Sequence, residues 1–241
     1  MKTVYLTIDD APSQRMGARV GLLCELQIPA IFFCSGNQLS DSPGPAVEAI
    51  ERGLVIGNHA WSHPHFSQLT VAQAHAEIAS TDELIDRLYR DAGHDRDHRW
   101  FRFPFGDQGD DFAGDAASPS LRAHRVELQS LLRALGYSAP AFADVAHPWF
   151  WPRGADVDWY WTFDSMDWAV SQNELSVQDA LARLALHDPA QRLALGDSSS
   201  ADIVLLHDHD HSAHAFERLI EALARMPLRF ALPEESPRRS I

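Results

Sequence analysis

Short apolar runs rich in β-branched and aromatic residues alternate along this chain with longer stretches in which apolar residues recur every three or four positions. The short runs are typical of buried strands, and the longer stretches are typical of amphipathic helices. Strands are predicted at residues 3–8, 30–34, 54–57, 100–104, 159–163, 203–206 and 228–231. Helices are predicted at residues 15–27, 45–52, 71–90, 120–135, 177–186 and 212–225.

The alternation of strand and helix predicts parallel βαβ units, because parallel strands need a crossover between them. Seven or so such units fit most simply into a closed or nearly closed barrel, and a doubly wound open sheet is the competing arrangement. Signals at helix ends agree with this division. Ser120 and Ser176 stand where helices are predicted to begin, and Gly53 and Gly136 stand where they are predicted to end.

One domain is expected over residues 1–241, because this length and a hydrophobic content of 45% are common in single-domain α/β barrels. Residues 106–119 are rich in Gly, Asp and Ser and predict a surface loop, and the polar tail 233–241 is predicted to fray. Residues 139–158 combine prolines with several large aromatic residues. Such a segment could line a binding cleft or plug one end of a barrel.

The formal net charge is −14, and Lys2 is the only lysine. This negative charge argues against a protein that binds along the phosphate backbone of a nucleic acid, and it fits neutral or cationic partners better. No apolar run approaches the length of a membrane span. Met1 and Lys2 lead directly into a strand, which leaves no room for a signal peptide, so a cytoplasmic protein is expected if the sequence is complete at this end. Cys24 and Cys34 are expected to be core residues.

Polar residues collect where the predicted strands end, which is where barrel enzymes build their active sites. The strand at residues 3–8 runs into Asp9 and Asp10. Successive residues of an extended chain point to opposite sides, so the two acids can serve one site only if the backbone turns, as Pro12 suggests. An Asp-rich turn without further function is the competing interpretation.

Two histidines four residues apart, His59 and His63, follow the third predicted strand. One helical turn would bring both rings to the same side, where they could share a metal ion. Two imidazoles and one carboxylate, here Asp10, make a common catalytic zinc set with a position left for water. In a chain with 13 histidines this spacing also arises by chance, and His65 is expected to point elsewhere.

Arg102 stands among aromatic residues in the fourth predicted strand. A buried arginine needs an acidic partner, and Asp9 is the candidate. The next two predicted strands run into further polar residues: Asp164, Asp167, Trp168, His207 and His209. Each group alone has a structural explanation, but five groups at the ends of strands indicate an active site.

These segments, in this order, resemble the motifs of the polysaccharide deacetylase family (NodB homology domain, carbohydrate esterase family 4). The resemblance spans residues 7–207 and rests on Thr7–Pro12, His59–His63, Arg102–Gly106, Asp164–Trp168 and Leu205–His207. It implies the fold class: α/β, a distorted (β/α) barrel with seven or eight parallel strands, TIM-like. It also implies a metal-dependent deacetylase that hydrolyses the N-acetyl amide of a poly- or oligosaccharide containing N-acetylglucosamine.

The resemblance further implies a role for each motif residue. Those in the reaction are Asp9 as base, Arg102 as its orienting partner, His207 as acid, Asp167 as the partner that tunes this acid, and Asp10, His59 and His63 as metal ligands. Those that contact substrate are Phe105, whose backbone N–H would stabilise the oxyanion, and Trp168 and Leu205, which would enclose the acetyl methyl group. Ile8, Ala11 and Phe105 stand where the family has Phe, Gly and Tyr, and Ala11 would resist a positive φ at that position.

The cofactor expected from this donor set is one divalent metal ion, with zinc first and cobalt, nickel or manganese as alternatives. The same fold could act on a small acetylated amine, a linear amide or a cyclic ureide, because fold does not fix substrate. A catalytically silent sugar-binding barrel is a further alternative. The histidine-rich run 207–214 could hold a second ion, although a solvated loop with one functional histidine at its start is favoured.

Overall fold

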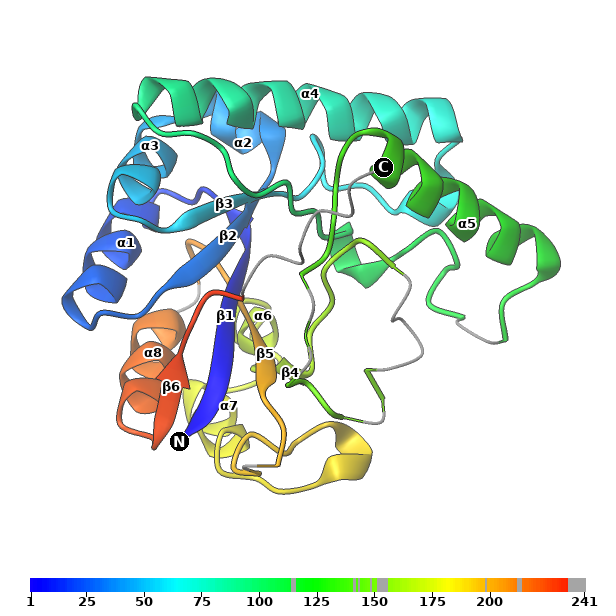
Figure 1. Cartoon of the computed structure of the whole chain (residues 1–241). Coiled ribbons are helices and arrows are strands. Elements are labelled where there is room, and N and C mark those ends of the chain that lie inside the picture. Colours follow the sequence, from blue (N-terminus) through cyan, green and yellow to red (C-terminus); the bar gives the residue numbers. More distant parts are fainter. Residues whose placement is uncertain are drawn as a thin grey trace.

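Six parallel strands form the sheet of the computed structural model, which describes residues 1–113, 116–140, 142, 144–147, 149, 150, 156–197, 199–211 and 214–233. These strands are β1 (Lys2–Ala11), β2 (Ala30–Cys34), β3 (Val55–Asn58), β4 (Phe163–Asp164), β5 (Asp202–His207) and β6 (Leu228–Phe230). Their order is β3-β2-β1-β5-β4, and β6 pairs with the start of β1. The longest strand, β1, therefore lies at the centre (Figure 1).

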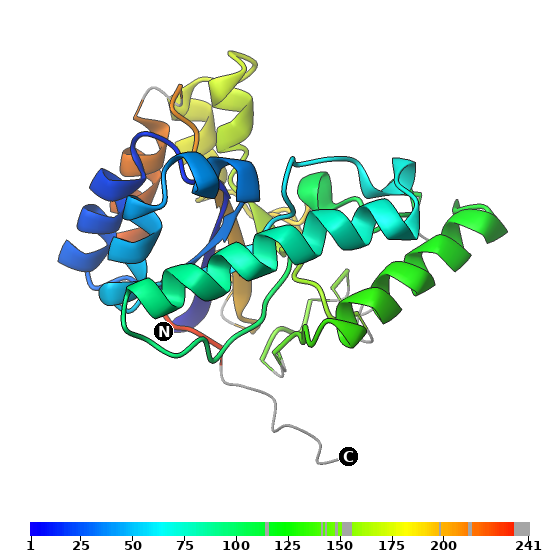
Figure 2. The same cartoon turned by 90° about the horizontal axis from the view of Figure 1, so that it is seen from above.

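Helices lie outside this sheet and follow one another around it (Figures 1 and 2). They are α1 (Met16–Glu25), α2 (Gly36–Asp41), α3 (Gly44–Glu51), α4 (Val71–Asp91), α5 (Pro119–Ala134), α6 (Asp167–Ser171), α7 (Val177–Arg183) and α8 (Ala215–Ala224). Short 3₁₀ turns are η1 (Phe66–Gln68), η2 (Pro104–Gly106) and η5 (Pro189–Gln191). Among the described residues, no helix is both long enough and apolar enough to cross a membrane.

Alternation along the strands divides the strands' own apolar side chains between two cores. The outer core lies between the strands and the helices and contains Leu6, Ile8, Phe32 and Val204. The inner core lies on the other side of the strands and contains Ile203, the neighbour of Val204 in the chain. This division follows from the period of two along a strand, because successive side chains point to opposite faces. The helices outside complete the first core with the apolar faces that their periodicity predicted.

The fold class predicted from the sequence is confirmed as a parallel α/β arrangement, but the strand expected at residues 100–104 is not regular. It makes one isolated bridge, between Phe101 and Asn58. Pro104 has no N–H to donate and begins η2, so a strand ladder cannot continue beyond Phe103. The regular sheet is consequently open between β3 and β4. Single hydrogen bonds, such as Trp159 N–H to the Phe101 carbonyl at 2.7 Å, link the segments across the opening.

Helix ends follow local chemistry closely. Gly53 and Gly136 adopt positive φ of 81° and 83°, as expected for residues that end helices. Ser176 begins α7 with a capping box, as predicted. Helix α5 instead begins after Ser118, whose hydroxyl accepts the Leu121 N–H, so the prediction of Ser120 as its cap was wrong.

Residues 106–119 were predicted to be a surface loop, and this is wrong for the first half of the segment. Asp107, Gln108 and Asp110 are buried because each polar group has a partner. Asp107 accepts from the Ser67 N–H and hydroxyl, and Gln108 donates to Asp158. Burial of polar side chains is tolerable when their hydrogen bonds are made, which composition alone does not reveal.

Within the aromatic segment 139–158, the described residues favour the plug over the cleft lining. Phe142 and Phe150 pack against the inner core, where the ring centroid of Phe142 lies 4.9 Å from that of Trp159. Cys34 is a buried free thiol, as expected for a core residue, and Cys24 packs against the outer core. Trp151 and the tail 234–241 lie outside the described residues.

Candidate active site

The two adjacent acids lie at a bulge within β1. The register with β2 shifts between Ile8 and Ala11, and Asp10 has a φ of 62°. Aspartate tolerates this left-handed conformation better than most residues. The strand therefore does not end at Ile8 as predicted but continues to Ala11, with the expected turn inside it. The left-handed residue is Asp10, so an alanine at position 11 has no positive φ to adopt.

His59 and His63 converge without a helix. The segment after β3 is irregular, and His63 has a φ of 57°, so the predicted helical turn is wrong. The two ring centroids nevertheless lie 4.9 Å apart because the loop folds back at Ala60, which has a φ of 65°. His65 points elsewhere, as expected, and stacks on Phe105 with centroids 4.1 Å apart.

Asp10 joins the two histidines. Its Oδ1 lies 2.9 Å from Nε2 of His63 and 3.5 Å from Nε2 of His59, and the ligand atoms of the three residues all lie within 4.8 Å of one another. His59 Nδ1 donates to the Arg102 carbonyl oxygen at 2.8 Å, so in the neutral ring Nε2 keeps its lone pair. Among the described residues this is the only such group of three potential ligands.

The electrostatics of Asp10 favour its charged form. Burial raises the pKa of this carboxyl group, but contacts with the imidazoles of His209, His59 and His63 outweigh burial and hold the pKa well below its usual range. Within the described residues, Oδ1 is buried and accepts no hydrogen bond of good geometry. A buried carboxylate oxygen without a hydrogen bond is costly, and a cation is one partner that would satisfy it.

Asp9 lies next to this group and is held by Arg102. The Arg102 Nη1 donates to Asp9 Oδ1 and to the Thr7 hydroxyl, both at 2.8 Å, and its guanidinium lies over the ring of Phe33. Arg102 is fully buried. The pairing predicted from the sequence is therefore present, and Thr7, which the sequence did not single out, completes it. Thr7 and Asp9 share a strand face because they are two residues apart.

His207 lies beside Asp9 on the neighbouring strand, since the two are register partners of β5 and β1. Asp167, at the start of α6, accepts from His207 Nδ1 at 2.9 Å and from its backbone N–H at 2.8 Å. Burial lowers the pKa of His207, but the charge and hydrogen bond of Asp167, together with the charges of Asp10 and Asp9, raise it to about 10. This shift favours the protonated form of the ring.

A cavity of about 460 Å³ connects these groups. Phe105, Trp168 and Leu205, the three residues predicted to bind substrate, all line it. Leu205 faces inward because it alternates with the outward side chains of β5, and Phe105 is 49% exposed at the rim. The sequence-predicted residues that line the same cavity are Asp9, Asp10, His59, His63 and His207. Arg102 and Asp167 lie behind it as partners of Asp9 and His207.

Five residues that line the cavity had no role assigned from the sequence: Gly106, Trp161, Asp164, Gln172 and His209. His209 is the most informative. Its Nε2 lies 2.8 Å from Asp10 Oδ2, and its ring lies 5.2 Å from that of His207. The run after β5 was interpreted as a loop with one functional histidine at its start, and this contact shows that a second histidine enters the site. The spacing of two residues in an extended segment was the available signal.

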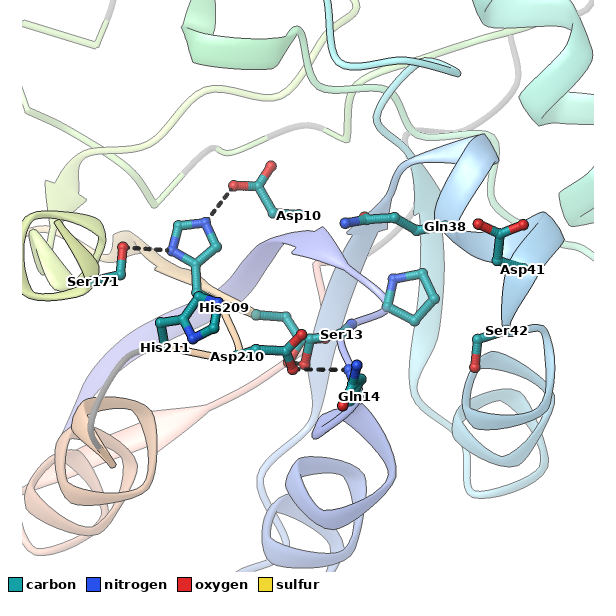
Figure 3. Close-up of a pocket in the computed structure, with 12 residues that line it drawn as sticks. Asp10, Ser13, Gln14, Gln38, Asp41, Ser42, Ser171, His209, Asp210 and His211 are labelled. Atoms are coloured by element: carbon teal, nitrogen blue, oxygen red, sulfur yellow. Dashed lines mark hydrogen bonds and ion pairs between the residues drawn. The ribbon is translucent and has the colours of Figure 1, made fainter.

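A second cavity, of about 570 Å³, lies on the other side of Asp10 and His209 (Figure 3). Its walls come from the ends of β1 and β5 and from α2 and α6, and apart from Pro12 they are polar: Ser13, Gln14, Gln38, Asp41, Ser42, Ser171, Asp208, Asp210 and His211. Asp10 and His209 line both cavities. This pair therefore forms a wall between the two.

Comparisons with known proteins show which proteins this chain resembles in sequence and in fold. The family model described as Polysaccharide deacetylase matches residues 1–124. The peptidoglycan-N-acetylmuramic acid deacetylase PdaC of Bacillus subtilis is 30% identical over 88 residues, which are 36% of this chain and 19% of that protein. The chain thus spans only about a fifth of that relative. A chitooligosaccharide deacetylase of a Bradyrhizobium species is 24% identical over 93% of this chain and 85% of its own length.

A solved structure has the same fold. The family 4 carbohydrate esterase from Streptomyces lividans, in complex with acetate, superposes with a TM-score of 0.61 at 22% identity and covers 96% of this chain and 92% of its own. At this identity the likeness concerns the fold alone. The family match covers the segments with Asp9, Asp10, His59, His63 and Arg102, whereas Asp167 and His207 lie beyond it.

Proposed function

Because this chain belongs to the polysaccharide deacetylase family, we propose that it is a metal-dependent hydrolase that removes acetyl groups from N-acetylglucosamine units of a poly- or oligosaccharide. The observation that carries the proposal is the meeting of Asp9 and His207, partners on adjacent strands, beside the group Asp10, His59 and His63. A candidate base and a candidate acid thus lie beside a candidate metal site, which is what amide hydrolysis requires.

Asp10, His59 and His63 fit a divalent cation. Two imidazole nitrogens and one carboxylate oxygen form a catalytic donor set for zinc, and cobalt, nickel and manganese are also accepted by such donors. The tautomer of His59 set by the Arg102 carbonyl and the unsatisfied Oδ1 of Asp10 support this assignment. A cation held there would supply Lewis acidity, which acidifies water and polarises an amide carbonyl.

Asp9 would take a proton from the attacking water. Its Oδ1 is held by Arg102, and its Oδ2 lies 3.8 Å from His59 Nε2, so the carboxylate is fixed next to the donor group. Fixing a base near its proton lowers the entropic cost of the reaction. The water oxygen bonds to the carbonyl carbon, and the backbone N–H of Phe105 would help to stabilise the oxyanion that forms, a kind of contact worth about 3 kcal/mol.

His207 would deliver the proton that the leaving nitrogen needs, because an amine leaves poorly unless it is protonated. Asp167 holds Nδ1, which leaves Nε2 for the cavity, and the raised pKa of His207 keeps the acid form available at neutral pH. The C–N bond then breaks and gives acetate and the free amine. Leu205 and Trp168 would enclose the acetyl methyl group between apolar surfaces.

Two variants separate the proposed roles. His63→Ala is expected to lose bound metal, measured by elemental analysis of the purified protein, because one of three ligands is gone. Asp9→Asn is expected to retain the metal and still lose acetate release by roughly 10²-fold or more, since the base is gone while the ligands remain. Turnover retained in Asp9→Asn would remove Asp9 from its proposed role.

The substrate class is tested by acetate release from chitooligosaccharides compared with small acetylated amines, linear amides and cyclic ureides. The proposal expects the higher kcat/KM for the chitooligosaccharides, in keeping with the relative that is a chitooligosaccharide deacetylase. A preference for a small amide would retain the mechanism but change the substrate. Bound metal without hydrolysis of any of these compounds would support a silent sugar-binding barrel.

A further inference from the structure

His209 makes a contact to which the proposed reaction assigns no role. The carboxylate of Asp10 divides its contacts: Oδ1 faces His63 at 2.9 Å and His59 at 3.5 Å, whereas Oδ2 faces His209 Nε2 at 2.8 Å. Figure 3 shows His209 between Asp10 and Ser171, with a dashed line to each. Oδ1 thus contacts the two histidines of the candidate metal site, and Oδ2 contacts His209.

Hydrogen-bond chemistry fixes the direction of the contact. An ionised carboxylate only accepts, so His209 Nε2 donates to Asp10 Oδ2. On the other side of the ring, Nδ1 lies 3.1 Å from the Ser171 hydroxyl, and Ser171 also contacts the Trp168 carbonyl at 2.6 Å. His209 is therefore held at both nitrogens, at Nε2 by Asp10 of β1 and at Nδ1 by Ser171 of α6.

The backbone of His209 is also fixed. Its carbonyl accepts from Arg19 Nη2 at 2.8 Å, and Arg19 is fully buried on α1, where it pairs with Asp208. A side chain held through both ring nitrogens and its carbonyl has little freedom left. It can therefore hold a partner in one orientation at a small further cost in entropy.

We propose that His209 is a positioning residue that holds Asp10 Oδ2 and thereby leaves Oδ1 alone to face the cation, between His59 and His63. This inference rests on the proposed function. Partners of metal ligands keep the ligands in place, and their loss typically lowers metal affinity by about 10- to 100-fold. Asp10 has particular need of such a partner because its backbone lies at a bulge, with a φ of 62°.

The test is the zinc dissociation constant, measured by competition with a chromogenic chelator. His209→Ala is expected to raise it by about 10- to 100-fold. His209→Gln, whose amide can still donate to Asp10 Oδ2, should recover part of this loss. The matched control is His211→Ala: His211 is exposed and lines the cavity beyond the wall, and its loss should leave zinc affinity unchanged. Circular dichroism of each metal-free variant establishes that it is folded.

Cobalt-loaded protein distinguishes positioning from ligation. The visible spectrum of Co²⁺ reports the number and kind of its ligands, and it should keep the same bands in the wild type and in His209→Gln. Zinc affinity equal to that of the wild type in folded His209→Ala would overturn the inference, as would loss of a nitrogen ligand in the cobalt spectrum of either variant. Failure of the wild type itself to bind metal or release acetate would instead contradict the proposed function.

Discussion

Asp167 shows how one carboxylate sets the chemistry of a neighbouring residue. It is fully buried, and it accepts two hydrogen bonds from His207 and one from the Ser165 hydroxyl. Burial raises the pKa of Asp167, but the charge and hydrogen bonds of His207 outweigh it and lower this pKa. The same pairing raises the pKa of His207 to about 10. Each partner thus favours the charged form of the other.

Replacement of Asp167 by Asn is expected to lower the pKa of His207, because it removes the negative charge beside the ring. The acid form of His207 would then be lost at a lower pH. The alkaline limb of the kcat/KM profile should move down by about one pH unit or more, where one unit corresponds to 1.4 kcal/mol. Glu221→Gln, which changes an exposed carboxylate, is the control and should leave the profile in place. An unshifted alkaline limb in Asp167→Asn would contradict the role of this pair.

At the scale of elements, Asp208 ties the segment after β5 to the segment after β1. Its carboxylate accepts from the Ser13 N–H at 2.6 Å and the Ser13 hydroxyl at 2.9 Å, and it pairs with Arg19 of α1. The side chains of Asp208 and Arg19 are fully buried. Since His207 and His209 flank Asp208 in the chain, these bonds set the position of both histidines relative to Asp10.

Asp208→Ala is expected to lower the free energy of unfolding by about 3–5 kcal/mol, because it leaves the Arg19 guanidinium buried without its acid. Urea denaturation followed by circular dichroism measures this change. Arg225→Ala offers the comparison, since the pair of Arg225 with Glu221 is exposed and such pairs contribute about 0–1 kcal/mol. Equal losses of unfolding free energy in Asp208→Ala and Arg225→Ala would contradict a special contribution from the buried pair.

At the scale of the whole molecule, the catalytic candidates gather where β1, β3 and β5 end, and the helices form the outer layer (Figure 1). The fold shifts the pKa values of charged groups near this edge. The pKa of His207 is raised, and the pKa of Asp167 is lowered. The pKa of Glu217 is lowered as well: burial raises it, but hydrogen bonds and the charges of Arg15 and Arg19 outweigh burial.

Stability of the metal-free protein should therefore fall at both ends of the pH range. Because the pKa values of Asp167 and Glu217 are lowered by folding, both groups stabilise the folded protein at pH values above their pKa in the unfolded chain, near 4. This contribution is lost as pH falls. Because folding raises the pKa of His207, this group contributes stability that is fully present below pH 6.5, its pKa in the unfolded chain. This contribution is lost as pH rises through about 10. Thermal unfolding between pH 3 and pH 10.5 measures both limbs, and a midpoint that does not fall above pH 8 would contradict the assignment for His207.

Much of the architecture was predictable because it depends on local chemistry. Alternation along strands and the periodicity of helices predicted five of the seven expected strands and most helices, and glycine and serine signals predicted several helix ends. The strand expected at residues 159–163 is present only at Phe163, where β4 begins. The failures have physical causes. Pro104 interrupts the strand at residues 100–104, and buried hydrogen bonds draw Asp107 and Asp110 inward from a segment whose composition is typical of a surface loop.

Motif order and spacing are properties of the chain, so the residue types at the ends of the strands could be predicted from the sequence. How these residues meet depends on the three-dimensional fold. Asp9 and Asp10 face one cavity through a bulge, His59 and His63 converge through an irregular loop, and His209 reaches Asp10 from a segment 199 residues away. Such convergence depends on strand register and on left-handed backbone positions, which are set by packing across the whole sheet, so local spacing alone does not establish which side chains meet.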